Sequence, residues 1–273
     1  MSGIAANAAS PDKSQYNLLN PTPRELMREM VTDRPDKTES PYTVDAGHYQ
    51  LEMDVFNYSV DHYNGIPGDQ RFEALAIAPI NIKAGVLNNL DVQLILQPYI
   101  SLRDHNVAAR VVNEERGFGD LISRVKLNFW GNDSGPTAFG VMPYIKLPTN
   151  TDHVGNNSVE GGVIFPFAAS LPYAFAIGFM TELDIKRDVL GDGHHPEFVN
   201  TITFGRDIVG NLAGFVEFSS SVSTESGSEW VGTFDCGLTY MLTRDMQLDA
   251  GVFLGVTRSA PDINPFLGFS WRF

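Results

Sequence analysis

The sequence is poor in cysteine, in positive charge and in long apolar runs, and each shortage excludes a class of protein. Among 273 residues there is one cysteine, Cys236, which excludes an intramolecular disulfide and a cysteine-built metal site. The 19 Lys and Arg stand against 33 Asp and Glu, and the net charge of -14 argues against a nucleic-acid partner, which would need a basic patch. No apolar run reaches the roughly 18 residues of a transmembrane helix.

Residues 1–45 are predicted to form a polar N-terminal extension. No basic-then-apolar signal peptide opens the sequence, so we expect the signal to be absent from it. The small residues of Ala5–Ser10 suit either the neighbourhood of a cleavage site or a polar tail. Residues 23–30 suit one short helix, with Thr22 as its N-cap. Residues 31–47 hold two prolines without periodicity, so an irregular, extended segment is expected there.

Residues 46–273 follow a different rhythm, in which polar and apolar residues alternate between turn signals. Most of the alternating segments are longer than the about 5–6 residues usual for strands, and they match the roughly 9–11 residues of a tilted strand crossing a bilayer. Twelve strands are expected, at 47–60, 71–86, 90–103, 119–130, 137–147, 158–169, 174–186, 197–206, 212–220, 229–242, 245–256 and 263–273.

The connections between these segments alternate in length. Short turns such as residues 87–89 and 243–245 alternate with longer polar loops such as Asp104–Gly119 and Arg187–Glu197. In an up-and-down sheet, alternate connections lie at the same end, so the short turns are expected at one end and the long loops at the other. Short periplasmic turns and longer external loops are typical of outer-membrane barrels. We predict an all-β fold: a 12-stranded antiparallel up-and-down transmembrane β-barrel.

Each predicted strand carries one apolar row and one polar row. In segment 90–103, Leu90, Val92 and Leu94 share one face, and Asp91 and Gln93 the other. The apolar rows run the whole strand length and aromatic residues cluster near strand ends, as expected for a barrel whose outside faces outer-membrane lipid. A soluble β-sandwich, with the apolar row inward, is the alternative fold.

The closing residues NPFLGFSWRF alternate apolar and polar side chains up to the last, aromatic residue, as a lipid-facing strand would. Leu267, Phe269, Trp271 and Phe273 lie on the lipid-facing row of the last strand, which must pair with the first strand to leave no edge. The terminal Phe273 resembles the C-terminal aromatic signal by which the barrel-assembly machinery recognises its clients. That machinery is therefore an expected partner.

Five stretches resemble a bacterial outer-membrane family commonly labelled the MetA pathway of phenol degradation, whose members are often described as transporters. The similarity covers about residues 31–273. It implies a barrel in the Gram-negative outer membrane and a passive channel for small solutes, and the family label suggests aromatic or hydrophobic compounds. The stretches are TDRPDKTESPYTVDAGHYQLE (Thr32–Glu52), GFGDL (Gly117–Leu121), KLPTNT (Lys146–Thr151), WVGTFDCGLTY (Trp230–Tyr240) and INPFLGFSWRF (Ile263–Phe273).

The polar rows predict a charged lumen in which a basic wall faces an acidic one. Two interpretations stay open: charge across an open pore that orients solutes, or charges that pair and fill the lumen. The residues expected to line the pore are Glu52, Asp54, Arg103, Arg124, Lys126, Lys146, Glu182, Asp184, Lys186, Glu217, Asp235 and Asp249. The N-terminal segment is expected either to plug the lumen or to stay periplasmic, and its plug candidates are Arg34, Asp36, Lys37 and Glu39.

We expect no catalytic residues, no metal and no cofactor. A lipid hydrolase needs a nucleophile and a base in contact, and the strand map places no histidine beside a serine on the lipid-facing row near the outer leaflet. The loop GDGHHPE offers His194, His195 and Glu197, but adjacent histidines on an extended loop point opposite ways, which favours a solvated loop. The sequence thus predicts an outer-membrane channel or transporter of unknown solute. The alternatives are a lipid-modifying barrel enzyme and a plugged, non-conducting barrel.

Overall fold

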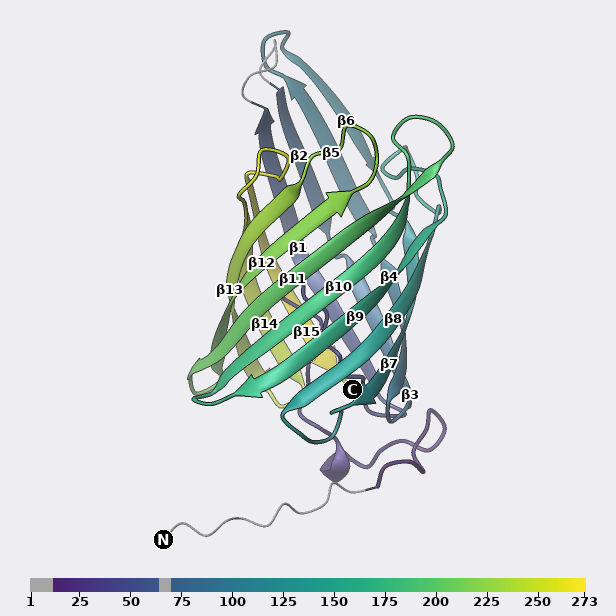
Figure 1. Cartoon of the computed structure of the whole chain (residues 1–273), viewed down its shortest axis with the longest axis vertical. Coiled ribbons are helices and arrows are strands. Elements are labelled where there is room, and N and C mark those ends of the chain that lie inside the picture. Colours follow the sequence, from purple (N-terminus) through teal and green to yellow (C-terminus); the bar gives the residue numbers. More distant parts are fainter. Residues whose placement is uncertain (1–11, 64–69) are drawn as a thin grey trace.

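Twelve long antiparallel strands close into a barrel in the computed structural model, which describes residues 12–63 and 70–273 (Figure 1). The predicted 12-stranded antiparallel barrel is confirmed. Some long strands are interrupted, so the described residues contain 15 strand elements. They are β1 (Tyr49–Tyr63), β2 (Gln70–Ile77), β3 (Ile80–Leu87), β4 (Leu90–Leu96), β5 (Tyr99–Asn106), β6 (Val111–Gly117), β7 (Leu121–Trp130), β8 (Thr137–Leu147), β9 (Glu160–Leu171), β10 (Phe175–Arg187), β11 (His194–Val209), β12 (Leu212–Ser223), β13 (Val231–Thr243), β14 (Met246–Gly255) and β15 (Ile263–Arg272).

The last strand pairs with the first, as the C-terminal pattern predicts. The β1–β15 ladder runs from Gln50 opposite Arg272 to Val60 opposite Ile263. At its base, the N–H of Phe273 donates to the carbonyl of Tyr49 at 2.9 Å. This pairing closes the barrel, so neither strand keeps a free edge along the paired stretch.

Two prolines interrupt the strands toward the long-loop end. Pro79 separates β2 from β3, and Pro98 separates β4 from β5. Proline has no N–H to donate to a ladder, so the pairing breaks at both places. Beyond the breaks, β5 pairs with β2 and β6, and this sheet extends above the other strands together with the end of β1 (Figure 1).

The prediction of a long loop at Asp104–Gly119 is wrong. Most of this stretch forms the end of β5 and all of β6, joined by a turn at residues 107–110. One charged residue of this polar stretch, Glu114, is paired across the hairpin with Arg103, whose Nε lies 2.9 Å from Glu114 Oε1. The connection predicted at Arg187–Glu197 is also shorter, because β11 already begins at His194.

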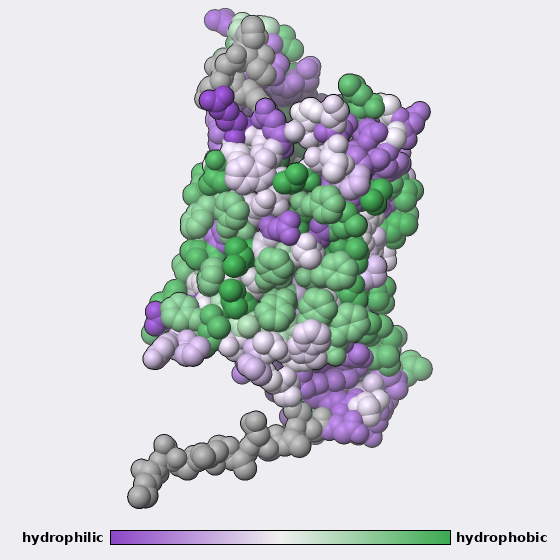
Figure 2. Space-filling model, viewed as in Figure 1, coloured by the Kyte–Doolittle hydropathy of each residue, from purple (hydrophilic) through white to green (hydrophobic). Residues whose placement is uncertain are grey.

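An apolar belt surrounds the barrel between polar ends, and Figure 2 shows it on one face. Water-soluble proteins rarely expose apolar patches larger than a few hundred Å². The belt therefore faces lipid, the sandwich alternative is excluded, and the fold fits the bacterial outer membrane as predicted. Exposed apolar side chains of the outward rows include Val92, Val125, Ile145, Phe179, Phe204, Val216, Phe234, Leu248 and Leu267.

Between residues 12 and 45 the N-terminal extension contains a single 3-10 turn, Arg24–Leu26, so the helix predicted at 23–30 is wrong. The residue before the turn is Pro23, without a side-chain cap, and Thr22 is not the N-cap. A helix this short is marginal by itself, and the N–H of Arg28 donates instead to Asp45 Oδ2 at 3.1 Å. No helix in the described part of the chain is long and apolar enough to cross a membrane. The Ala5–Ser10 stretch lies outside the described residues.

Candidate functional site

The interior of the barrel is polar, and residues 31–46 run through it (Figure 1). We call this stretch the lumenal segment. Its sequence alternates acidic and basic side chains, and each meets a wall residue of opposite charge, with one exception described below. Unpaired buried charges are costly, so these contacts determine where the segment lies.

The acidic residues of the lumenal segment face the basic part of the wall. Asp33 forms ion pairs with Lys83 of β3 and Lys126 of β7, each at 2.5 Å, and all three side chains are almost completely buried. Lys83 also contacts Glu52 of β1. Further along, Glu39 pairs with Arg124 of β7.

The basic residues of the segment face the acidic part of the wall. The Arg34 guanidinium lies 2.7 Å from Asp54 Oδ1 of β1 and 2.8 Å from Asp249 Oδ1 of β14. Gly268 of β15 makes room for this guanidinium, because a Cβ there would lie 2.0 Å from Arg34 Nη2. Lys37 Nζ lies 3.2 Å from Asp235 Oδ2 of β13.

The backbone of the lumenal segment is held as well. The N–H groups of Lys37 and Thr38 each donate to a carboxylate oxygen of Glu217 on β12, at 2.8 Å. The hydroxyls of Thr38 and Thr201 are 2.6 Å apart. Asp36 is the exception among the charged residues at 33–39: no described residue forms an ion pair with it, and its carboxylate meets the Thr203 hydroxyl.

A second cluster holds the extension at the short-turn end. We define the basal cluster as Lys13, Arg28, Asp45, Asp133 and Arg272. Asp45 is fully buried, and it receives Lys13 Nζ at 3.2 Å, Arg28 Nε at 3.1 Å and Arg272 Nη1 at 3.4 Å. Burial raises the pKa of Asp133, but the hydrogen bonds from Lys13 and Asn88 and the nearby Arg28 outweigh it and lower that pKa.

The strand register gives the position of each predicted pore residue. Eleven of them lie on lumen-facing rows, and two of these, Glu217 and Asp235, lie directly opposite each other on adjacent strands. They are Glu52, Asp54, Arg124, Lys126, Lys146, Glu182, Asp184, Lys186, Glu217, Asp235 and Asp249.

Arg103 is placed wrongly by the sequence pattern. Arg103 of β5 lies opposite Glu73 of β2, and Glu73 lies opposite Val60 of β1. Val60 is on the same row of β1 as the outward-facing Phe56, so this whole row, Arg103 included, faces outward. The break at Pro98 shifts the alternation between β4 and β5, and a shift of one residue moves every later side chain to the other face. Arg103 is therefore on the outer face of the extended sheet.

Sequence reasoning missed Lys83 and the basal cluster. Lys83 lies in a predicted strand, but Pro79 lies within the same strand and obscures its parity. The members of the basal cluster come from both ends and the middle of the chain, and no local pattern joins Asp45 to Arg272. The alternation from Ile80 to Leu87, counted separately, is the signal that would have found Lys83.

Above the lumenal segment, three apolar side chains from neighbouring strands pack together on the lumen side of the wall. Met142 of β8, Ile164 of β9 and Met180 of β10 form a buried cluster, each at most 2% exposed. The N–H of Glu39 lies 3.4 Å from Met180 Sδ, so the segment contacts this cluster. Above it the lumen is polar again, where Tyr144 donates to Asp184.

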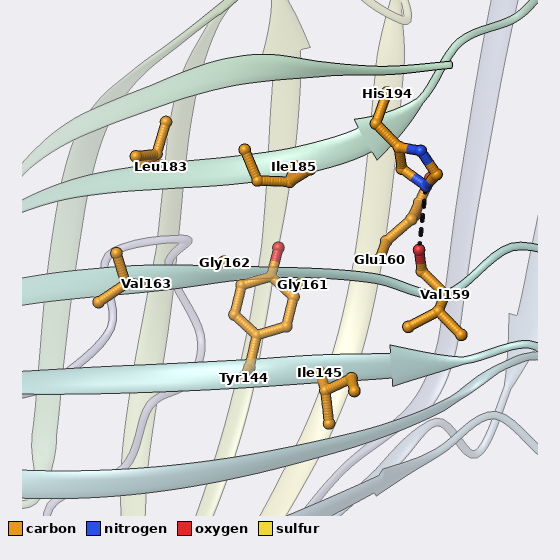
Figure 3. Close-up of a pocket in the computed structure, with 10 residues that line it drawn as sticks. All are labelled: Tyr144, Ile145, Val159, Glu160, Gly161, Gly162, Val163, Leu183, Ile185 and His194. Carbon is orange, nitrogen blue, oxygen red and sulfur yellow. Dashed lines mark hydrogen bonds between the residues drawn. The ribbon is translucent and has the colours of Figure 1, made fainter. Parts of the chain in front are cut away.

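The outer wall carries a groove of about 660 Å³ beside β9. Figure 3 shows it between Ile145, Leu183 and Ile185, where Gly161, on the outward row of β9, has no side chain to fill it. Ile145 and Ile185 belong to the exposed apolar belt. The groove therefore opens toward lipid.

The sequence analysis expected no histidine beside a serine on the lipid-facing row, and this expectation is wrong. His194, at the edge of the groove, has its Nε2 3.2 Å from Ser158 Oγ (Figure 3 shows His194). The cause is the early start of β11, which brings His194 against the chain just before β9. The same Nε2 lies 3.2 Å from the Val159 carbonyl.

A different trio at the rim has the geometry of a metal site. Asp188, His195 and Glu225 offer ligand atoms within 4.8 Å of one another, the one such group found in the described residues. His195 Nδ1 already lies 2.8 Å from Asp188 Oδ1. The trio considered from the sequence does not assemble, because Glu197 pairs with Lys186 at 2.6 Å and His194 turns to Val159.

Comparison with known proteins supports the fold. The family model described as "Putative MetA-pathway of phenol degradation" matches residues 32–273, and no curated protein matches the chain. The chain is similar to the COG4313 outer membrane channel from Pseudomonas putida F1, with a TM-score of 0.65 and 12% identity over 89% of this chain and 100% of that one.

Two autotransporter barrels are also similar. The transport unit of AIDA-I from Escherichia coli has a TM-score of 0.54 and 9% identity, covering 89% of this chain and 93% of its own. The NalP translocator domain from Neisseria meningitidis has a TM-score of 0.51 and 9% identity, covering 82% and 88%. At such low identity these likenesses concern the fold.

Proposed function

Because this chain belongs to the family described as the putative MetA-pathway of phenol degradation, we propose that it is a channel for passive or facilitated uptake of small solutes across the outer membrane. Aromatic or other hydrophobic compounds are the proposed solutes, on the strength of the family description. The resemblance in fold to a protein titled an outer membrane channel supports this proposal.

One observation carries the proposal: a closed wall separates a polar interior from lipid, and cavities remain in that interior beside the lumenal segment. A purely structural barrel has no need of space along its axis. The extension, residues 1–45, is proposed to act as a plug within the barrel of residues 46–273. In that role, Arg34, Lys37 and Glu39 bind the wall, while Asp36 faces free space.

Planar-bilayer conductance of the purified protein tests the function. The full-length protein and a variant without residues 1–45 are compared, after heat-modifiable electrophoretic mobility has shown that both barrels are folded. Conductance from the full-length protein supports an open or gated channel, and conductance only after truncation supports a plug. Silence from both folded forms would contradict a channel.

A lipid-modifying enzyme is the second candidate, and the Ser158–His194 pair beside an apolar groove is the observation that favours it. The geometry is incomplete. His194 Nε2 is shared with the Val159 carbonyl, and no described acid or amide is hydrogen-bonded to the other ring nitrogen, although a catalytic histidine needs an orienting group. We expect no phospholipid hydrolysis, and hydrolysis abolished by Ser158→Ala would establish the enzyme instead.

We also propose that the barrel-assembly machinery recognises the last strand. Phe273 is 54% exposed, and its ring stacks on Tyr49 at 5.9 Å and lies 4.7 Å from the Trp271 ring. An exposed aromatic end on the closing strand is a suitable recognition element, because it is available before and after closure.

A further inference from the structure

Three cavities follow one another along one side of the lumenal segment. The innermost, about 210 Å³, lies between the segment and β9–β11. The next, about 430 Å³, shares four lining residues with it: Asp36, Ala176, Gly205 and Phe215. The third, about 510 Å³, shares Asp207, Ala213 and Thr239 with the second and reaches the short turns at Asn211 and Arg244. The cavities therefore form a continuous row toward the periplasmic end.

The wall along this row differs from the rest of the lumen. Most of its lumen-facing side chains are small and uncharged: Ala168, Ser170, Ala176, Gly178, Gly205 and Ala213. The exceptions are the apolar ring of Phe215 and, near the periplasmic end, Asp207. The ion pairs of residues 33–39 lie elsewhere, on β1, β3, β7, β13 and β14. Toward β10–β12 the segment is held by uncharged-group and backbone contacts to Met180, Thr201 and Glu217, and space remains beside them.

The row ends beneath the apolar cluster of Met142, Ile164 and Met180. The innermost cavity is lined by Thr38, Glu39 and Ser40, and the N–H of Glu39 contacts Met180. Methionine side chains are flexible and adapt to irregular space. A hydrophobic constriction stops water and ions by dewetting, but an apolar solute loses nothing by entering it.

We propose that solutes cross through this row of cavities, the side passage, while the lumenal segment stays bound. This inference rests on the proposed channel function. Met142, Ile164 and Met180 form the gate at its outer end, and moving three side chains is easier than breaking the buried ion pairs of Asp33 and Arg34. The solute class follows from the lining: small, uncharged molecules with an apolar part.

Asp36 lines both the first and the second cavity, and no described residue forms an ion pair with it. Its carboxyl group therefore places one polar side chain beside the mostly apolar walls of the side passage.

Cysteine labelling in a gate-opened background tests the side passage. Met180→Ser makes the gate polar, and we expect it to raise KCl conductance several-fold over the unmodified protein. Gly205→Cys is then added, because a Cβ at Gly205 meets only the Gly214 carbonyl, at 3.9 Å, and so points into free space. A cationic methanethiosulfonate reagent on Cys at this position should reduce the conductance by more than half. Ala176→Cys serves as a second passage variant if the first folds poorly.

The gate variant with only the native Cys236 is the matched control, because this residue pairs with Val216 and Val252 on the outward row and its labelling should leave conductance unchanged. Full labelling at position 205, verified by mass spectrometry, without loss of conductance would overturn the side passage but leave the channel intact. Conductance that appears only after Asp33→Asn and Arg34→Gln would also overturn it, since the segment would then have to leave. Silence from every folded variant would contradict the channel function itself.

Discussion

Replacing Arg34 by methionine should release the lumenal segment from the wall. Arg34 bridges Asp54 and Asp249, and only 17% of its side chain is exposed. Methionine keeps much of the length and removes the charge, so two carboxylates lose their cation. Removing one partner of a buried ion pair costs about 3–5 kcal/mol. At about 1.4 kcal/mol per factor of ten, the docking equilibrium should fall by roughly 10²-fold to several thousand-fold.

Hydrogen exchange of the segment's amides measures this equilibrium. The N–H groups of Lys37 and Thr38 are hydrogen-bonded to Glu217 and exchange only when the segment opens. In detergent, mass spectrometry of a peptide covering residues 31–46 should show exchange faster by about the same factor. Peptides from β10 and β11 should not change.

Two variants make the test specific. Arg116→Met is the matched control, because Arg116 is exposed, pairs with Glu114 outside the lumen, and should leave exchange of the segment unchanged. The triple variant Arg34→Met with Asp54→Asn and Asp249→Asn removes all three charges together and should recover part of the protection, since no unpaired charge remains. If Arg34→Met leaves the exchange of residues 31–46 unaltered, the ion pairs do not hold the segment and the reasoning fails.

Three further predictions follow from the same contacts. Gly268→Val should displace the Arg34 guanidinium, because a Cβ there would lie 2.0 Å from Nη2, and the same exchange assay should show faster opening; wild-type protection would contradict the close approach. Burial raises the pKa of Asp245, but hydrogen bonds and charge from Arg272 outweigh it and lower that pKa. Because the folded pKa lies below the unfolded value of about 3.9, this contact stabilises the protein above that pH and is lost as the pH falls through the folded value. The midpoint of heat-modifiable mobility should therefore stay level from neutral pH to mild acid and fall at lower pH, and Asp245→Asn should flatten that fall. Deleting Phe273 removes its stacking on Tyr49 and the proposed recognition element, so the amount of folded barrel in the outer membrane should drop, whereas normal assembly would exclude the signal.

The strands and the closure of the barrel could be predicted from sequence because both depend on local signals. Alternation along each segment and the alternating lengths of the connections are properties of neighbouring residues. They identified twelve strands, the lipid-facing rows and the pairing of the last strand with the first. The closing row of Leu267, Phe269 and Trp271 shows this most clearly.

The errors arose where a local signal was interrupted or a contact was distant. Pro98 shifted the alternation and placed Arg103 on the wrong face. The charges of Asp104–Gly119 suggested a loop, although the strands of that hairpin pair with each other. The contact of Ser158 with His194 joins residues 36 positions apart, and only the folded barrel brings them together.

The position of the lumenal segment could be predicted in part. Its charges and those of the walls were visible in the sequence, and charge alone favours contacts of Arg34 and Lys37 with acidic wall residues. Which carboxylates they meet depends on strand height and tilt, which alternation does not encode.

The basal cluster has a consequence for the seam between β1 and β15. Arg272 is the final residue of β15, and it binds both the extension, at the Arg28 carbonyl and Asp45, and the β13–β14 turn, at Asp245. Lys13 and Arg28 form ion pairs with the same Asp45, which lies just before β1 in the chain. The first and last strands are thus tied through side chains as well as through their backbone ladder. Separating β1 from β15 at this end requires these ion pairs to break first. The extension therefore makes the seam harder to open than the backbone hydrogen bonds between the two strands would alone.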